Sequence, residues 1–192
     1  WHGKNTDERF KEAIFGAYEA LKELRSAGKV SAIGVGINDT AICVRFAQHC
    51  DLDCFMLAAR YTLLDQSALE EMLPLCLEKH ISVLIAAPFN SGILATGPIP
   101  GAQYAYKDPP LEILERTRKL VSVCRKYKIS LAAAALQFPS FHPAVASVVV
   151  GIKSTNELSQ NILSFNCSIP CEFWEELKDR QLLPPQAPTP SC

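Results

Sequence analysis

A glycine, a lysine and a serine with the chemistry of a phosphate site follow the last apolar segment of this 192-residue chain. Segment 150–154 reads Val-Gly-Ile-Lys-Ser and runs straight into an expected helix. Gly151 permits close approach of the backbone, Lys153 supplies a positive charge, and Ser154 and the free N–H groups of the helix start can bind an anion. This is a candidate phosphate site. An ordinary capped helix with a surface lysine fits the same pattern equally well.

A second candidate ligand-binding segment is 88–92 (Pro-Phe-Asn-Ser-Gly), which directly follows the most continuous apolar run. The ring of Phe89 can stack on a flat ligand. The side chains of Asn90 and Ser91 can hydrogen-bond polar ligand atoms. The alternative is a turn that merely leaves the sheet.

Asn38, Arg60 and Tyr61 follow two further apolar segments, 30–36 and 53–59. Taken singly, such residues are more often structural. Ligands of parallel α/β folds bind at the C-terminal ends of the strands, and all of these features share that position. We therefore consider them together as one candidate site.

Alternating strands and helices are expected to position these residues. Strands are expected at 30–36, 53–59, 81–87 and 145–150, and helices at 10–24, 40–50, 67–79, 108–127, 131–138, 154–165 and 170–181. Continuous apolar strands that alternate with helices predict an α/β fold with a parallel sheet covered by helices. Four strands fit either a small doubly wound sheet or half of an eight-stranded barrel.

Local signals set several of the expected helix boundaries. Ser67-x-x-Glu70 and Ser154-x-x-Glu157 are capping boxes, and Asp108 precedes two prolines at a helix start. Gly28 is expected to end the first helix. Residues 184–192 contain four prolines and are expected to be a disordered tail.

Composition and absent motifs exclude several classes of function. The formal net charge is −1 with no basic stripe, so no nucleic-acid partner is expected, and no apolar run approaches membrane-spanning length. The sequence contains no G-x-G-x-x-G motif after a strand, no P-loop and no G-x-S-x-G or H-E-x-x-H motif. No secretory signal peptide is visible, and a start at Trp1 is consistent with a fragment.

The eight cysteines are expected to be reduced structural thiols. None forms a C-x-x-C pair, no histidine pair follows at zinc spacing, and most fall on apolar faces. We therefore expect no metal site. Free thiols predict a reducing compartment, most simply the cytoplasm.

Several stretches in the same order resemble the aldo-keto reductase superfamily. They are 28–36 (GKVSAIGVG), 87–94 (APFNSGIL), 131–138 (LAAAALQF) and 151–154 (GIKS), followed by Leu158 and Asn161. Segment 59–66 (ARYTLLDQ) resembles the branch of 1-dehydrogenases that act on D-threo-aldoses, L-fucose and L-galactose. The resemblance covers about residues 10–183.

The resemblance implies the last four units of a (β/α)₈ TIM-type barrel, over residues 1–183. It also implies hydride transfer between NADP or NAD and a small carbonyl or sugar substrate. Lys153 weakly favours NADP, whereas relatives in this branch often use NAD. Carried over by position, the implied cofactor-binding residues are Asn38 at the nicotinamide, Pro88, Phe89, Asn90, Ser91 and Gly92 along the ring and pyrophosphate, Gly151, Lys153 and Ser154 at the adenosine-side phosphate, and Glu157 and Asn161 toward the adenine.

The sequence departs from the family where catalysis is expected. Ala58 and Ala86 replace a glutamine and a tyrosine that contact the nicotinamide in relatives. Of the family's catalytic Asp, Tyr, Lys and His, the first three belong to an N-terminal half that this sequence does not contain. His2 is a weak candidate for the fourth.

Three functions remain open at this point. The first is an enzyme seen in part, and the second is a non-catalytic module that binds a cofactor or a partner. The third is an unrelated barrel enzyme that binds sugar phosphates without a nicotinamide. Exposed strand edges would also favour self-association.

Overall fold

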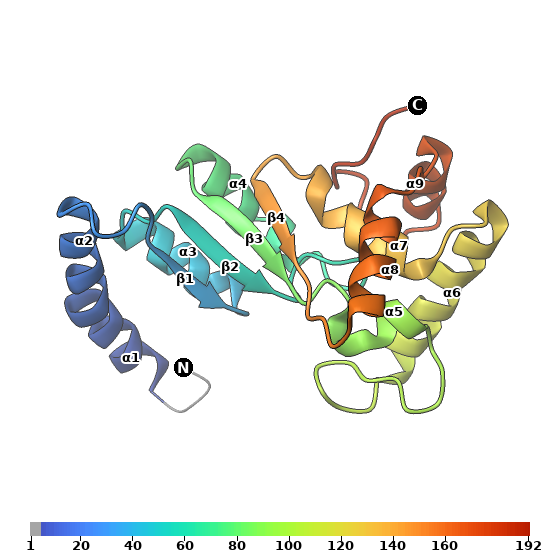
Figure 1. The fold of residues 1–192 in the computed structure, drawn as a ribbon, viewed down its shortest axis with the longest axis horizontal. Coiled ribbons are helices and arrows are strands. Elements are labelled where there is room, and N and C mark those ends of the chain that lie inside the picture. Colours follow the sequence, from blue (N-terminus) through green and yellow to red (C-terminus); the bar gives the residue numbers. More distant parts are fainter. Residues whose placement is uncertain (1–4) are drawn as a thin grey trace.

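The computed structural model describes residues 5–192, and a four-stranded parallel sheet lies at its centre (Figure 1). Each strand pairs in parallel with the next strand along the chain. The strands are β1 Gly34–Ile37, β2 Cys54–Ala58, β3 Ser82–Ala86 and β4 Val145–Val149. The expected parallel sheet is confirmed.

Helices precede and follow the strands. They are α1 Thr6–Glu12, α2 Glu19–Ser26, α3 Thr40–His49, α4 Met72–Glu78, α5 Ile93–Thr96, α6 Leu111–Tyr127, α7 Leu131–Gln137, α8 Thr155–Asn166 and α9 Cys171–Asp179. Three 3₁₀ turns occupy Ser67–Leu69, Asn90–Gly92 and Phe138–Phe141. Figure 1 shows α1 and α2 beyond the β1 edge and the C-terminal helices gathered beyond β4. No helix of residues 5–192 is long and apolar enough to cross a membrane.

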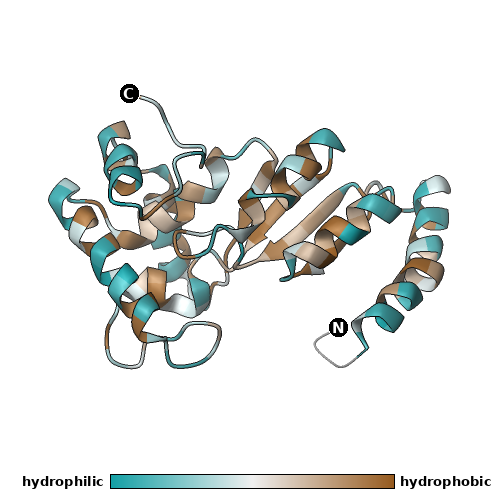
Figure 2. Cartoon of the chain, turned by 180° about the vertical axis from the view of Figure 1, so that it is seen from behind, coloured by the Kyte–Doolittle hydropathy of each residue, from teal (hydrophilic) through white to brown (hydrophobic). Residues whose placement is uncertain are grey.

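The two faces of the sheet differ in burial. Phe55 and Leu57 of β2, and Ile85 of β3, are fully buried on one face. On the opposite face the Met56 side chain is 41% exposed, and Leu84 is half-buried. The apolar strands (brown in Figure 2) are thus covered well on one side only, although their composition predicts cover on both.

Two of the expected helix signals form as predicted. The Gly28 N–H donates to the Arg25 carbonyl and the Lys29 N–H to that of Leu24, at 3.0 and 2.9 Å, with Gly28 at φ +67°. This is the Schellman arrangement, in which glycine adopts the left-handed conformation that ends a helix. At the start of α8, Ser154 Oγ accepts the Glu157 N–H at 3.1 Å.

Two other expected caps are wrong. Ser67 Oγ donates to Asp65 Oδ1 at 2.6 Å and opens only a 3₁₀ turn, because that carboxylate competes for the hydroxyl. Asp108 does not cap α6, which begins after Pro110 without a side-chain cap. The preceding prolines favour an extended backbone there.

The first helix differs from its expected pattern because a π-helical segment, Ala13–Tyr18, separates α1 from α2. The wider turn rotates the following residues relative to an α-helix. Phe10 is buried, whereas Leu21 and Leu24 remain 36% and 43% exposed. The expected apolar face is therefore only partly buried.

The C-terminal residues take a defined path. Trp174 of α9 is fully buried and packs on Phe173, Phe141 and Phe138. Within segment 184–192, Ala187 is buried against the core. Composition alone does not reveal this contact, because a single alanine supplies it.

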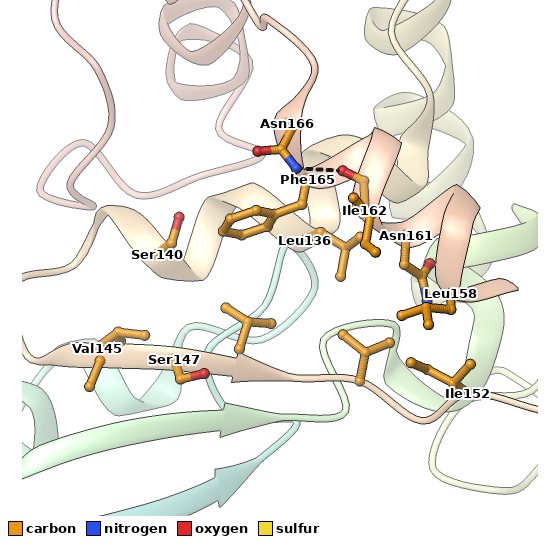
Figure 3. A pocket seen from close by; sticks show the side chains of 13 residues that line it. Leu136, Ser140, Val145, Ser147, Ile152, Leu158, Asn161, Ile162, Phe165 and Asn166 are labelled. Carbon is orange, nitrogen blue, oxygen red and sulfur yellow. Dashed lines mark hydrogen bonds between the residues drawn. The ribbon is translucent and has the colours of Figure 1, made fainter. Parts of the chain in front are cut away.

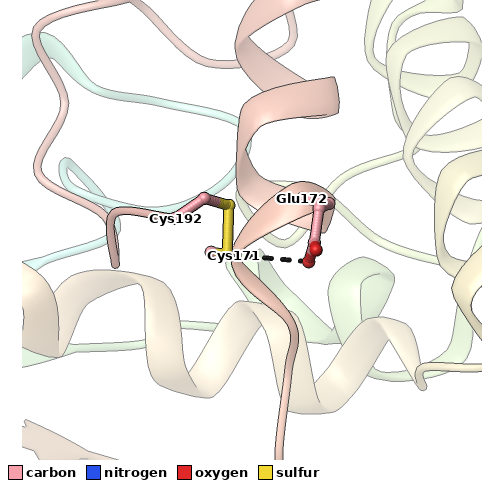
Figure 4. Close-up of side chains that lie close together, drawn as sticks. All are labelled: Cys171, Glu172 and Cys192. Atoms are coloured by element: carbon pink, nitrogen blue, oxygen red, sulfur yellow. Dashed lines mark hydrogen bonds between the residues drawn. A yellow bond between two sulfur atoms is a disulfide. The ribbon is translucent and has the colours of Figure 1, made fainter.

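The cysteines follow the expectation except at the C-terminus. Cys43, Cys50, Cys76 and Cys124 are buried free thiols, and burial raises the pKa of Cys43 to about 12. Cys171 and Cys192 form a disulfide beside Glu172 (Figure 4), contrary to the expectation of free thiols. Their spacing of 21 residues gives no sequence signal for pairing. The bonded sulfurs do not offer thiolates to a metal.

Candidate functional site

A cavity of about 360 Å³ lies at the C-terminal ends of β1, β2 and β3. Parallel α/β folds bind ligands at this end of the sheet. The lining residues are Asn38, Ala58, Ala59, Arg60, Ala87, Asn90, Ser91, Tyr104, Ala105 and Tyr106. The structure thus brings Asn38, Asn90 and Ser91 together as expected, and adds Tyr104 and Tyr106 from the loop after α5.

Unusual backbone conformations gather around this cavity. Ten non-glycine residues of the described chain have positive φ, and six of them line the cavity: Ala59, Ala87, Asn90, Ser91, Ala105 and Tyr106. The left-handed conformation costs a non-glycine residue about 1–2 kcal/mol. Such strain concentrates at functional sites. Its concentration here supports a binding role for the cavity.

Asn90 presents an unsatisfied polar atom at the cavity. The residue is 3% exposed, and its Nδ2 donates to the Ala59 carbonyl at 3.5 Å, the limit of a hydrogen bond. Its Oδ1 has no hydrogen-bond partner among residues 5–192. Buried polar atoms are nearly always paired, so this oxygen is suited to accept a hydrogen bond from a ligand.

Arg60 is held in place by two neighbours. Its Nε donates to the Asn38 carbonyl at 2.8 Å, and its Nη1 donates to Asp65 Oδ2 at 3.0 Å. Ser67 donates to the other Asp65 oxygen through its N–H and its hydroxyl, at 2.9 and 2.6 Å. Arg60 thereby links the end of β1 to the loop after β2.

A tight hairpin covers one side of the cavity. Tyr104 and Lys107 exchange backbone hydrogen bonds of 2.9 and 3.1 Å around Ala105 and Tyr106, which both have positive φ. Ser91 Oγ accepts the Tyr106 N–H at 3.1 Å and so attaches the hairpin to the loop after β3. Burial, followed by the charge of Asp65, raises the pKa of Tyr104, and Arg60 and Arg116 oppose this shift.

The other residues of segment 88–92 support the loop rather than line the cavity. Pro88 is buried, and Phe89 is half-buried against the hydrophobic core. Gly92 has φ +105°, which only glycine adopts readily. The Phe89 ring is therefore packed beside the core and does not line the cavity.

The candidate phosphate residues lie after β4, outside the cavity lining. Gly151, Lys153 and Ser154 are exposed. The Glu157 carboxylate accepts the Lys153 N–H at 2.8 Å, so an anion bound at this helix start would displace or repel that carboxylate.

Asn161 belongs to a different feature, a groove of about 430 Å³ between β4 and α8 (Figure 3). The groove is largely apolar, with Leu158, Ile162 and Phe165 of α8 on one side and Val145 of β4 and Ile152 on the other. Asn161 therefore stands at an open apolar groove rather than at the strand-end cavity.

Tyr61, a candidate from its position after β2, is a core residue. It is fully buried, and its ring packs on Phe138 and His142 at centroid distances of 5.0 and 5.6 Å. Burial raises the pKa of Tyr61. It therefore does not present its hydroxyl to the cavity.

His142 predicts a pH dependence of stability. Burial lowers the pKa of His142 below its ordinary 6.5, and its Nδ1 accepts the Ala144 N–H at 3.2 Å, which requires a neutral acceptor nitrogen. Below pH 6.5 the unfolded chain therefore binds more protons, and the free energy of unfolding should fall as the pH decreases. Urea unfolding from pH 7.5 to 5 checks this.

In a His142→Asn variant the free energy of unfolding should depend less on pH between 7.5 and 5. The His80→Asn variant, changed at an exposed position, should keep the full pH dependence. A slope shared equally by all three proteins would show that His142 does not cause it.

Comparison with known proteins identifies the family. The model of the aldo/keto reductase family matches residues 1–180. This chain belongs to the aldo/keto reductase family. Pyridoxal 4-dehydrogenase of Microbacterium luteolum is 44% identical over 169 residues, which is 88% of this chain and 49% of that enzyme. D-threo-aldose 1-dehydrogenase of a Pseudomonas species is 39% identical over 173 residues, 90% of this chain and 53% of that enzyme.

Solved structures of aldo-keto reductases share the fold. The apo form of an enzyme from Bacillus halodurans has a TM-score of 0.72 at 21% identity, over 94% of this chain and 59% of its own. An enzyme from Klebsiella pneumoniae in complex with NADP and acetate has a TM-score of 0.61 at 20% identity, over 90% of this chain and 55% of its own. The chain thus spans about half the length of the relatives it matches. Its fold is that of an α/β, (β/α)₈-barrel-like aldo-keto reductase with a parallel sheet.

Proposed function

We propose that this chain is the cofactor-holding part of an NAD(P)-dependent oxidoreductase that acts on a small carbonyl or sugar substrate. The observation that carries the proposal is the unpaired, buried Asn90 Oδ1 in a cavity at the strand ends of an aldo/keto reductase chain. The carboxamide N–H of a nicotinamide can donate a hydrogen bond to this oxygen. A bound nicotinamide would supply the hydride that such enzymes transfer.

The residues of this chain fit three parts of an NAD(P) molecule. Asn38 and Asn90 would bind the nicotinamide end, and the loop Pro88–Gly92 would support it. Gly151, Lys153 and Ser154 would hold the adenosine-side phosphate, where Lys153 offsets the nearby Glu157 carboxylate. Glu157 and Asn161 would border the adenine, next to the groove of Figure 3.

The cavity itself supplies an incomplete set of proton-transfer groups. Its lining contains Tyr104 and Tyr106 but neither lysine nor histidine. A tyrosine acid in this chemistry needs a neighbouring cation to lower its pKa. Arg60 and Arg116 act on Tyr104 in that direction, but burial outweighs them and the pKa of Tyr104 is raised. Catalysis by this chain alone is therefore impaired, and a non-catalytic module is the alternative. The His2 candidate lies outside the described residues.

We infer that residues 1–183 form about the last four units of the barrel. The edges of the sheet at β1 and β4 pair with no further strand among residues 5–192. Helices α1 and α2 precede β1, and α8 follows β4. Each edge strand is therefore already connected to a helix of this chain. A segment that begins and ends on a strand would supply the missing neighbour at each edge. Edge-to-edge association of two copies, the competing proposal, would bring two helices to each junction.

The names of the relatives support two kinds of substrate, an aldose and an aromatic aldehyde such as pyridoxal. The six free cysteines support a reducing compartment such as the cytoplasm, although the Cys171–Cys192 disulfide counts against it.

Fluorescence titration of the chain with NADPH and NADH tests the proposal, alongside dehydrogenase assays with L-fucose. We expect saturable binding without turnover. A Lys153→Glu variant should weaken NADPH binding at least about tenfold, since it replaces an attractive charge by a repulsive one at the phosphate. Lys119→Glu, at an exposed position on α6, is the matched control.

Absence of binding, or equal weakening by both variants, would contradict the cofactor assignment. Turnover at a rate typical of enzymes would contradict the proposed impairment.

A further inference from the structure

We propose that Arg60, held by an ion pair with Asp65, determines substrate specificity together with Tyr104, by binding a hydroxyl oxygen of the substrate at the cavity. The proposal rests on the proposed function for the identity of the reaction. It concerns residues that the cofactor assignment does not use.

Arg60 has donors to spare. A guanidinium carries five N–H groups. One N–H on Nε binds the Asn38 carbonyl and one on Nη1 binds Asp65, and no other partner occurs among residues 5–192. Three donors therefore remain on a side chain that lines the cavity and is 41% exposed.

Asp65, the ion-pair partner of Arg60, is itself held by several hydrogen bonds. Both Asp65 oxygens are engaged, Oδ2 by Arg60 and Oδ1 by Ser67, and the Asp65 side chain is only 15% exposed. The Asp65 N–H in turn donates to Thr62 Oγ1 at 3.1 Å. An arginine held this way loses little further freedom on binding a ligand. Asp65 is thus a positioning residue that acts through Arg60.

The charge of the pair selects the kind of ligand. The Asp65 carboxylate neutralises the guanidinium at 3.0 Å, so the site offers hydrogen-bond donors with little net positive charge. Tyr104, on the hairpin that lines the same cavity, adds a phenol whose pKa is raised. It therefore stays protonated and can donate as well. A hydroxyl oxygen of the substrate fits such donors better than a phosphate or carboxylate does.

The backbone of the hairpin is strained in a way that keeps Tyr104 near Arg60. Ala105 and Tyr106 adopt left-handed conformations although neither is glycine or asparagine, and the Ser91 hydroxyl accepts the Tyr106 N–H. A simple loop would relax to a less costly turn. We attribute this strain to the placement of the Tyr104 side chain over the cavity.

The test compares Arg60→Met with Arg118→Met, an exposed arginine of α6, in the full chain. Saturation-transfer NMR measures dissociation constants for L-fucose, for L-fucose 1-phosphate and for propanal, which lacks hydroxyl groups. NADPH affinity is measured separately by fluorescence. We expect Arg60→Met to weaken L-fucose binding about tenfold, with no change in Arg118→Met.

Two further variants separate positioning from general damage. Asp65→Asn should weaken L-fucose binding in the same direction, and the Arg60→Met/Asp65→Asn double variant should lose no more than Arg60→Met alone. Tyr104→Phe should weaken L-fucose binding about threefold without affecting propanal.

Several results would overturn the proposal. The first is an equal loss of L-fucose and propanal binding in Arg60→Met, and the second is that L-fucose 1-phosphate binds more tightly than L-fucose and depends on Arg60. The third is that the losses of Arg60→Met and Asp65→Asn add up in the double variant. The fourth is that the unaltered chain does not bind L-fucose. If the unaltered chain does not bind NADPH, that result would count against the proposed function instead. The two results can be told apart because L-fucose binding is measured without cofactor.

Discussion

Gly34→Ala is expected to destabilise the fold by about 3 kcal/mol, a large part of the stability of an ordinary domain. A Cβ at Gly34 would lie 2.3 Å from the Cys54 carbonyl oxygen and 2.6 Å from its sulfur. Gly34 and Cys54 are partners in the β1–β2 register. The backbone oxygen cannot move aside without breaking the pairing of the two strands. Urea unfolding followed by circular dichroism measures the loss.

Gly36→Ala is the matched control, two residues along the same strand. Apart from its own chain neighbours, no atom of the described residues lies within 4 Å of a Cβ at Gly36. Alanine also restricts the unfolded chain more than glycine does, so this variant should be neutral or more stable by up to about 1 kcal/mol. Equal destabilisation by both variants would mean that β1 and β2 do not approach as the structure shows.

Trp174→Ala is expected to cost about 3–5 kcal/mol. Trp174 is fully buried, and its ring centroid lies 4.9 Å from that of Phe173 and 5.1 Å from that of Phe141. Removal of the indole leaves a cavity that these rings cannot fill. Unfolding should be followed by circular dichroism, because the substitution removes a fluorophore.

Trp174→Phe provides the comparison for that prediction. The buried Trp174 Nε1 has no hydrogen-bond partner in the part of the chain that the structure describes. Phenylalanine therefore removes an unsatisfied donor while it retains most of the packing. We expect a loss of about 1 kcal/mol or less. A loss as large as that of Trp174→Ala would contradict the packing described for α9.

The sequence was sufficient to predict the elements of this fold wherever one signal dominated. Continuous apolar runs gave all four strands to within a few residues, and Gly28 and Ser154 marked helix boundaries that the structure has. Ser67 failed as a cap because Asp65, two residues earlier, bonds its hydroxyl. Such competition depends on side-chain geometry, which the spacing of residues does not contain.

The candidate site was predictable only in part. Asn38, Asn90 and Ser91 follow strands, and this position alone suggested the cavity that they line. Tyr104 and Tyr106 gave no signal, because a hairpin of this type usually contains glycine or asparagine and segment 104–107 has neither. Arg60 was a candidate because of its position after a strand, but its ion pair with Asp65 could be seen only in the structure.

Hydrogen–deuterium exchange of the chain with and without NADPH tests the central claim, that this chain holds the cofactor at the C-terminal ends of its strands. We predict slower exchange on NADPH binding in segments 87–92 and 151–158. Segments 50–53 and 79–82, at the opposite end of the sheet, should not change. Protection at that opposite end, or none in either strand-end segment at saturating NADPH, would contradict the account.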